Sequence, residues 1–476
     1  MSEVVTKELP EGWQWSTMED ISDVIGGGTP KSKVNRYYDN GEIPWLTPAD
    51  LSGYKNKYVT RGRRNITEEG LNSSSAKLMP AGSVLFTSRA PIGYVVIASN
   101  EICTNQGFKS FVMKSEDVFP DYVYWWLKGN KQLAESVASG TTFLELSGAK
   151  AKKLPIPIAP PEQQKHIVAK IEELFSHIDA GIESLKKVKQ LLKQYRQSVL
   201  KAAVTGELTK EWREVNKAKL EPAGKLLERI ETYRNKWIEN QIAEGGSEAK
   251  RLKNKLNKHE FDELEKEYVP KEWVSVSLLK LCLVVVDCHN KTAPYVEKGI
   301  PLIRTSNIRH GVINFKEKMK YVNEETYEYW SRRCPPESGD ILFTREAPMG
   351  ESAIVPEGTK VCMGQRMMLL RVIRELSDLD YLHIALMEPL FQKRFQNFKV
   401  GVGVQHLRVG DVEKSVIALP SLEEQKEIVR VANEKMDSIK RLELEIGHQL
   451  KKAEKNKKSV LVSAFSGKLG NEGLLQ

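Results

Sequence analysis

The stretch PPEQQKHIVAKIEELFSHIDAGIESLKKVKQLLKQYRQSVLKAAVTGEL, residues 160–208, decides the fold of this 476-residue chain. Its apolar residues recur at alternating steps of four and three, with Gly181 at the one remaining position of the pattern. The repeating residues are Ile167, Ile171, Leu174, Ile178, Leu185, Val188, Leu192, Tyr195 and Val199. An apolar repeat of this period is typical of a coiled-coil helix, which buries a narrow seam against a second helix. We therefore expect one long helix that needs a helical partner.

Both ends of this expected helix carry boundary signals. Pro160, Pro161 and Glu162 favour a start, because proline fits the first turn and an acidic side chain stabilises the positive end of the helix dipole. Gly206 favours an end, because glycine readily adopts the left-handed conformation that closes many helices. About 40 residues at 1.5 Å each would span ~60 Å, which exceeds one ~34 Å turn of duplex DNA.

A second copy of the stretch supplies a candidate partner. Residues 421–469 begin with SLEEQKEIV, in which Ser421 and Glu424 have capping-box spacing, and end with FSGKL. Its apolar repeat is less regular and consists of Ile428, Ala432, Ile439, Leu442, Ile446 and Leu450. Because each helix leaves a different half of the chain, we expect antiparallel pairing that acts as a spacer. The alternative is that each helix packs on its own half.

The repetition extends beyond the helices. LPEGW at residues 9–13 returns as VPKEW at 269–273, and LFTSRAPIG at 85–93 returns as LFTREAPMG at 342–350. Each copy also contains short β-like runs, such as SVLFT followed by YVVIA and DILFT followed by AIVPE. We expect a tandem duplicate of a compact α/β (α+β) domain with many loops. Loops can change recognition chemistry without disturbing a core.

The landmarks divide the chain into five expected segments. They are a first recognition-type domain at 1–158, a first coiled-coil helix at 159–209, a charged helical linker at 210–269, a second domain at 270–420 and a second coiled-coil helix at 421–470. Within the linker, apolar residues at helical spacing predict a helix that docks on another: Leu226, Ile230, Tyr233, Trp237 and Ile242. The remainder, residues 248–268, mixes both charges densely and is interpreted as a solvated helix or tether.

Composition narrows the class of protein. The formal net charge is +9, which favours a polyanionic partner. No apolar run approaches the ~18 residues of a membrane span, and the first residues lack a signal-peptide pattern, so we expect a soluble, cytoplasmic protein. The five cysteines form no CxxC pair and are expected to be free thiols. Cys282, Cys288 and His289 lack a fourth ligand at a spacing that would suit zinc.

Four enzyme classes fit the sequence poorly. A methyltransferase would have a glycine-rich cofactor loop that leads into a helix, but the triple glycine at 26–28 is followed by no helical run. The Asp/Asn-Pro-Pro-aromatic element of a base methyltransferase is also absent from the sequence. SGKLG at 466–470 lacks the spacing of a nucleotide-binding loop. The E-x-K triplet at 424–426, which could suggest a nuclease, is expected to lie on a helix face. The sequence also lacks the Ser/His/Asp or HExxH grouping of a hydrolase. We therefore expect a non-catalytic chain without metal or cofactor.

Candidate DNA contacts fall into two groups. Two basic loops of the first copy are expected to contact phosphates, through Lys31, Lys33 and Arg36 and through Lys55, Lys57, Arg61, Arg63 and Arg64. Residues able to pair with base edges are Arg89 and Gln106 in the first copy and Arg345, Gln365, Arg366, Gln405 and Arg408 in the second. Arg304 and Arg309 are further candidate DNA contacts. A solvated surface position is the alternative for each. Arg89 aligns with Glu346, so the two copies are expected to read different sequences.

The ordered landmarks resemble the specificity subunit of type I restriction-modification enzymes. The first copy carries P-x-x-W, GGTPK with GEIPWLTPADL, LFTSRAPIG, LPIP, PPEQQ and a basic helix that ends with VTGEL. The second carries DCHNKTAPY with GIPLIRTSNI and then ALPSLEEQ. The likeness covers about 400 of the 476 residues and departs at the long, charged link of residues 209–268.

This resemblance implies two target recognition domains joined by an antiparallel coiled coil in a pseudo-twofold arrangement. Each domain would read one half of an asymmetric, bipartite site in double-stranded DNA. The helices would set the spacing and dock two methyltransferase (modification) subunits, to which motor-nuclease (restriction) subunits add. S-adenosylmethionine, ATP and Mg would belong to those partners, and no membrane would be involved. A coiled-coil protein-interaction scaffold without sequence-selective DNA binding is the alternative function.

Overall fold

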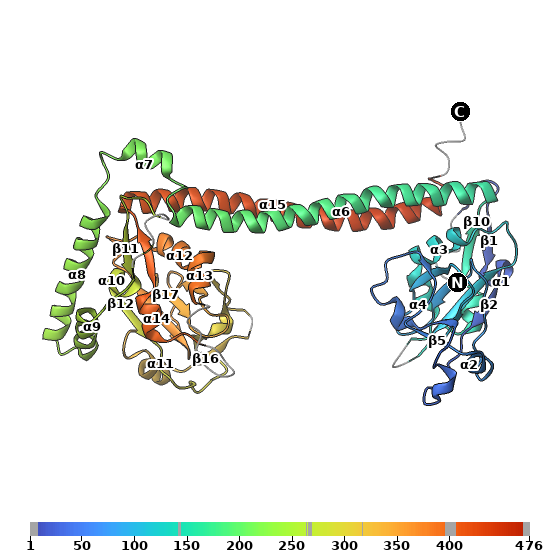
Figure 1. The fold of residues 1–476 in the computed structure, drawn as a ribbon, viewed down its shortest axis with the longest axis horizontal. Coiled ribbons are helices and arrows are strands. Elements are labelled where there is room, and N and C mark those ends of the chain that lie inside the picture. The colour runs from blue at the N-terminus through green and yellow to red at the C-terminus, as the bar shows by residue number, and fades with distance from the viewer. Residues whose placement is uncertain are drawn as a thin grey trace. The chain divides into compact units, whose positions relative to one another are not determined.

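The computed structural model describes residues 8–140, 144–262, 264, 269–316, 318–395 and 406–469. It divides into two compact units, of which unit 1 comprises residues 1–187 and 446–476 and unit 2 comprises residues 188–445. Helix α6 (Pro161–Val204) and helix α15 (Leu422–Ala464) both cross this division. Each unit therefore contains one mixed α/β domain and part of each long helix (Figure 1).

The domain of unit 1 is built on two small sheets and a two-stranded ribbon. The larger sheet has the order β2-β9-β6-β7-β4 and the smaller one β5-β3-β8, while β1 pairs with β10. The strands are β1 (Gln14–Thr17), β2 (Ser22–Gly26), β3 (Ile43–Leu46), β4 (Tyr58–Val59), β5 (Arg64–Ile66), β6 (Val84–Thr87), β7 (Val95–Ala98), β8 (Cys103–Thr104), β9 (Phe108–Met113) and β10 (Pro155–Ile158). The helices are α1 (Met18–Ile21), α2 (Glu68–Asn72), α3 (Pro120–Gly129), α4 (Lys131–Val137) and α5 (Gly148–Lys152).

Unit 2 repeats this topology. Its sheets have the orders β12-β20-β17-β18 and β16-β13-β19, with ribbons β11-β21 and β14-β15. The strands are β11 (Val274–Ser277), β12 (Val284–Asp287), β13 (Ile300–Ile303), β14 (Ile308–Arg309), β15 (Val312–Ile313), β16 (Lys320–Val322), β17 (Ile341–Thr344), β18 (Ser352–Ile354), β19 (Cys362–Met363), β20 (Met367–Arg371) and β21 (Val416–Leu419). The helices are α10 (Leu278–Leu281), α11 (Glu324–Ser331), α12 (Leu379–Met387), α13 (Pro389–Arg394) and α14 (Val409–Lys414). In both small sheets the central strand pairs in parallel with its later neighbour, β3 with β8 and β13 with β19.

The two long helices run antiparallel. In unit 1, Lys457 of α15 forms an ion pair with Asp179 of α6. In unit 2, Arg196 of α6 forms an ion pair with Glu443 of α15 at 2.9 Å. Within unit 2, Thr209 just after α6 donates to the Oε1 of Glu424 at 2.8 Å, so the sequence position rises along α6 as it falls along α15, which agrees with the expected pairing. The alternative, in which each helix packs on its own half of the chain, also holds at the start of α6, where Ile167 is buried in the core of the first domain.

The apolar repeat predicted which residues of α6 would be buried, and it was correct for only some of them. Leu192 and Val199 are buried, at 8% and 3% exposure. Val188 and Tyr195 are 43% and 47% exposed, and Ile182 is buried in place of the exposed Gly181. Adjacent residues lie about 100° apart around a helix, so a run with neighbouring apolar residues is compatible with two seams. The partner helix selects one of them.

The charged linker is packed against the second domain. Residues 248–268 were predicted to be a solvated helix or tether; up to Asn257 they form a helix, but one that buries Ala249 and Leu252, and residues 263 and 265–268 lie outside the described residues. The linker forms α7 (Lys210–Asn216), α8 (Ala223–Ala243) and α9 (Ser247–Asn257). Leu226 and Ile230 of α8 are fully buried in the core of unit 2, as the helical spacing predicted. Tyr233 is 48% exposed instead. Helix α9 buries Leu252, which shows that densely charged segments still dock when a few apolar side chains share one face.

One tryptophan in each domain anchors the start of its long helix. The indole nitrogen of Trp13 donates to the Oε1 of Gln163 at 2.9 Å, and that of Trp273 donates to the Oε2 of Glu424 at 2.8 Å. In both domains the tryptophan of P-x-x-W therefore bonds the fourth residue of the PPEQQ or SLEEQ motif. The motifs fix the point at which each helix leaves its domain.

Gln164 completes this joint in unit 1, and its replacement by leucine is expected to destabilise the unit by about 1–3 kcal/mol. Its side chain is fully buried, accepts from the backbone N–H of Phe119 and donates to the carbonyls of Asp117 and Ala159. Leucine would leave these backbone groups unpaired. Hydrogen exchange at the Phe119 amide should accelerate, whereas the exposed control Glu162→Gln should not change it. Equal exchange in both variants would contradict this role.

None of the helices in the described ranges is both long and apolar enough to span a membrane.

Candidate nucleic-acid interface

Three loops of unit 1 meet beside the edge of its small sheet. They follow β2, β6 and β8, and backbone hydrogen bonds join them. The N–H of Gly28 donates to the carbonyl of Thr104 at 2.9 Å, and the N–H of Ser88 donates to the carbonyl of Gly107 at 2.7 Å. A Cβ added to Gly27 would collide with the carbonyl of Asn105. A Cβ on Gly28 would likewise collide with the backbone of Ala76, so Gly27 and Gly28 are required for this close approach, whereas Gly26 has open space around it.

The same loop cluster recurs in unit 2. The N–H of Arg345 donates to the carbonyl of Arg366 at 2.9 Å, which repeats the contact of Ser88 with Gly107. The N–H of Gly364 donates to Ile303 at 2.8 Å, as that of Asn105 donates to Leu46 in unit 1. These matches align Gln106 with Gln365, which were predicted as separate base contacts.

Each of these glutamines is hydrogen-bonded to a threonine from the first loop. The hydroxyl of Thr29 donates to the Oε1 of Gln106, and the hydroxyl of Thr292 donates to the Oε1 of Gln365 at 3.3 Å. All four residues are exposed. Sequence reasoning missed both threonines, because each lies more than 70 residues from its glutamine. Their occurrence just before Pro30 or Ala293 in matching loops was the available signal.

The charges beside the two pairs differ. In unit 1, Arg89 lies 3.7 Å from Glu145. In unit 2, the aligned residue is Glu346, which lies 3.5 Å from Arg366. The aligned position is therefore a cation, Arg89, in unit 1 and an anion, Glu346, in unit 2.

A cavity of about 200 Å³ accompanies the cluster of unit 2. Its lining includes Thr292, Arg304, Glu346, Gln365 and Arg366. Three of these residues, Arg304, Gln365 and Arg366, were predicted DNA contacts, and the fold brings them together from two separate loops. The cavity thus places hydrogen-bond donors and acceptors, both neutral and charged, on one small surface.

Most of the predicted phosphate contacts lie on the surface. The exposed residues of the candidate set are Lys31, Lys33, Arg36, Lys55, Arg61, Arg63, Arg64, Gln106, Arg309, Gln365 and Arg408. Some of them already have protein partners: Arg36 pairs with Glu69 at 3.0 Å, and Arg64 stacks over the Tyr38 ring at 3.7 Å. Arg89, Arg304 and Arg366 are half-buried, and Gln405 lies outside the described residues. Contact with DNA stays a prediction for all of them.

Two predicted contacts have structural partners instead of a free surface. Lys57 forms ion pairs with Asp121 and Glu172 of the first domain and α6. Burial alone would lower the pKa of Lys57, but hydrogen bonds to the two carboxylates raise this pKa well above its usual value. Arg345 is only 4% exposed and donates to the carbonyl of Leu407 at 3.0 Å. The structure gives both residues a role in holding loops or helices in place.

The described residues offer little for metal or thiol chemistry. All five cysteines are free and buried. Burial raises the pKa of Cys103 and of Cys282 to about 12, so both thiols stay protonated at neutral pH. Within the described ranges, no three His, Cys, Asp or Glu side chains are grouped to hold a metal ion.

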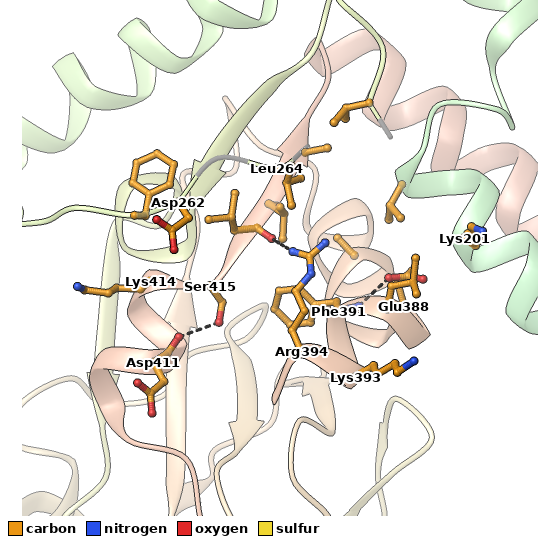
Figure 2. A pocket seen from close by; sticks show the side chains of 18 of the residues that line it. Lys201, Asp262, Leu264, Glu388, Phe391, Lys393, Arg394, Asp411, Lys414 and Ser415 are labelled. Atoms are coloured by element: carbon orange, nitrogen blue, oxygen red, sulfur yellow. Dashed lines mark hydrogen bonds between the residues drawn. The ribbon is translucent and has the colours of Figure 1, made fainter. Parts of the chain in front are cut away.

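A larger cavity of about 1010 Å³ lies elsewhere in unit 2, beside α13, α14 and β21 (Figure 2). Arg394 reaches across it to the carbonyl of Val416 at 3.0 Å. The same lining contains Glu388, Asp411 and Lys414. Charges of both signs at this cavity do not favour a polyanion, and none of the predicted DNA contacts lines it.

Two domains with matching loop clusters, each joined to a shared pair of antiparallel helices, define a duplicated recognition protein. A family model described as "Type I restriction modification DNA specificity domain" matches residues 10–194 and 270–452. The chain belongs to this family. The identification made from the sequence motifs and the predicted fold class are thereby confirmed.

Individual relatives agree with this assignment. The chain is 29% identical over 422 residues to the type I restriction enzyme MjaIX specificity subunit of Methanocaldococcus jannaschii, covering 87% of this chain and 84% of the relative. It is 27% identical over 468 residues to the EcoBI specificity subunit of Escherichia coli, covering 97% and 87%.

Solved structures share the fold. One comes from work on complex assembly and conformational transition of the type I R-M system, with a TM-score of 0.64, 16% identity and coverage of 97% of this chain and 100% of that chain. The HsdS subunit from Thermoanaerobacter tengcongensis gives a TM-score of 0.56 at 15% identity, with coverage of 97% and 99%.

Proposed function

We propose that each unit reads one half of a two-part sequence in double-stranded DNA. The observation that carries this proposal is the loop cluster repeated in both units, with a Thr–Gln pair in each and opposite charges at the aligned positions Arg89 and Glu346. Shared geometry suits one type of ligand, whereas different side chains suit different base sequences. Phosphate contacts from the surrounding exposed lysines and arginines would add affinity without sequence choice.

The chemistry of modification and cleavage is assigned to partner subunits. Two methyltransferase subunits would supply S-adenosylmethionine-dependent methylation, and restriction subunits would supply ATP- and Mg-dependent translocation and cleavage. The chain itself contributes recognition and placement. Its recognition loops carry amides, hydroxyls and cations, which are suited to hydrogen bonding with DNA.

The test is methylation by the reconstituted complex. The chain would be assembled with the modification subunits of its own system, and modified DNA would be read by single-molecule sequencing. We expect a motif of two specific halves separated by a non-specific gap. A coiled-coil scaffold would yield no sequence-selective methylation, and a one-part motif would overturn the proposed division of labour.

A change of helix length should change the gap between the half-sites. We propose inserting one heptad after Lys187 in α6 and one after Glu445 in α15, which keeps the seam in register. Seven helical residues add about 10.5 Å, equal to about three base pairs. The sequenced motif should keep both halves and lengthen its gap by about that number. A control with seven residues added after Gly245, between α8 and α9, should leave the gap unchanged. An unaltered gap in the helix variant would argue against a spacer role.

A further inference from the structure

We infer that Gln106 and Gln365 are equivalent specificity-determining residues, and that Thr29 and Thr292 orient their amides so that an Nε2 hydrogen remains available to DNA. This inference rests on the proposed function and deepens it, because it names the class of base edge that each unit reads. The edge is one that presents hydrogen-bond acceptors, as guanine O6 and N7 do in the major groove.

The position of the pair is fixed by backbone contacts on both sides. Gly27 and Gly28 press the first loop against Thr104 and Asn105, which immediately precede Gln106. The N–H of Gly107 donates to the side-chain oxygen of Asn105 at 2.9 Å, which tightens the turn after the glutamine. Gln106 therefore projects from a rigid turn and remains exposed.

The orientation of the amide follows from the network in unit 2. The Nε2 of Gln365 donates to the backbone carbonyl of Asn290 at 3.5 Å. A carbonyl can only accept, so one Nε2 hydrogen must face Asn290 and the oxygen end must face Thr292. The second Nε2 hydrogen is the donor that remains for DNA. The hydroxyl of Thr292 then donates to Oε1, as the hydroxyl of Thr29 does in unit 1.

This orientation changes the base that a glutamine can read. A free glutamine pairs with adenine through both amide ends, since the oxygen accepts from N6 and the nitrogen donates to N7. In this chain the oxygen of Gln106 is already bound to Thr29. Thr29 occupies one of the two acceptor positions of this oxygen, whereas the Nε2 donors have no bond to Thr29, so the amide favours an edge that offers acceptors.

Cations lie near each Thr–Gln pair. Lys31 and Lys33 follow Thr29 in the same loop and are exposed. Arg304 and Arg366 line the cavity that also contains Thr292 and Gln365. Lys31 and Lys33 can hold phosphates while the Gln106 amide meets a base, which is the usual division between positioning and base contacts. Arg366 is instead paired with Glu346.

The experiment compares Thr29→Val with Thr29→Ser in the reconstituted modification complex. Valine has nearly the shape of threonine but no hydroxyl, so the Gln106 oxygen becomes free. We expect one base pair of one half-site to lose its preference by about tenfold and to accept adenine. Serine keeps the hydroxyl and should preserve the original motif. Gln106→Glu should disfavour the original base and favour cytosine, whose N4 amino group is a donor.

Thr292→Val provides the matched test in unit 2 and should alter only the other half-site. A wild-type complex without a two-part motif would overturn the proposed function. A normal wild-type motif that is unchanged in Thr29→Val and in Gln106→Glu would overturn the present inference alone. A change of both halves by a single substitution would also overturn it.

Discussion

Replacing Arg213 by methionine should lower the free energy of unfolding of unit 2 by about 3–5 kcal/mol. Arg213 of α7 forms an ion pair with Glu424 at 2.6 Å, and their side chains are only 7% and 2% exposed. Methionine would remove the positive charge and leave a carboxylate in the core. A buried, unpaired charge is among the most costly defects that one substitution can create.

The first unit contains the control for this prediction. Its residue equivalent to Glu424 is the neutral Gln163, which accepts from Trp13 without any arginine. The double variant Arg213→Met with Glu424→Gln should therefore recover most of the lost stability. Hydrogen exchange of the full chain at residues 209–216 and 421–432 would measure both effects. Equal exchange in the single variant and the wild type would contradict the role of the ion pair.

Replacing Phe465 by alanine should destabilise unit 1 by about 3–5 kcal/mol. Phe465 follows α15 and inserts between two aromatic residues of α3, with ring centroids 5.0 Å from Tyr122 and 5.1 Å from Trp126. Its side chain is 6% exposed, so alanine would leave a cavity in the main core of the unit. The end of α15 would lose its attachment to the first domain.

Val462→Ala is a suitable control, because Val462 lies on the same helix and is 60% exposed. It should change stability by less than about 0.5 kcal/mol. Hydrogen exchange at residues 446–464 and 120–129 should rise in Phe465→Ala and stay unchanged in the control. A loss of methylation confined to one half-site would accompany the structural effect. Unaltered exchange in Phe465→Ala would show that other contacts hold this helix end.

The predicted recognition residues illustrate what sequence patterns miss. Gln106 and Gln365 were identified as able to contact bases, but their threonine partners were not, because loop contacts between distant segments leave no local pattern. Arg345 was identified for the same reason as Arg89, yet it is buried against Leu407. The aligned motif could not reveal this, because a residue's exposure depends on the loops that cover it.

The sequence by itself determined the duplication, the two long helices, their antiparallel pairing and the family. These properties follow from local periodicity and from ordered motifs, which need no knowledge of contacts. The tertiary structure decided that Ile182 is buried while Gly181 is exposed, that the charged linker packs on the second domain, and that Lys57 pairs with carboxylates. It also brought Thr29 to Gln106 and Thr292 to Gln365. The physical reason is that burial, charge pairing and amide orientation depend on groups far apart in the chain, which only folding brings within hydrogen-bonding distance.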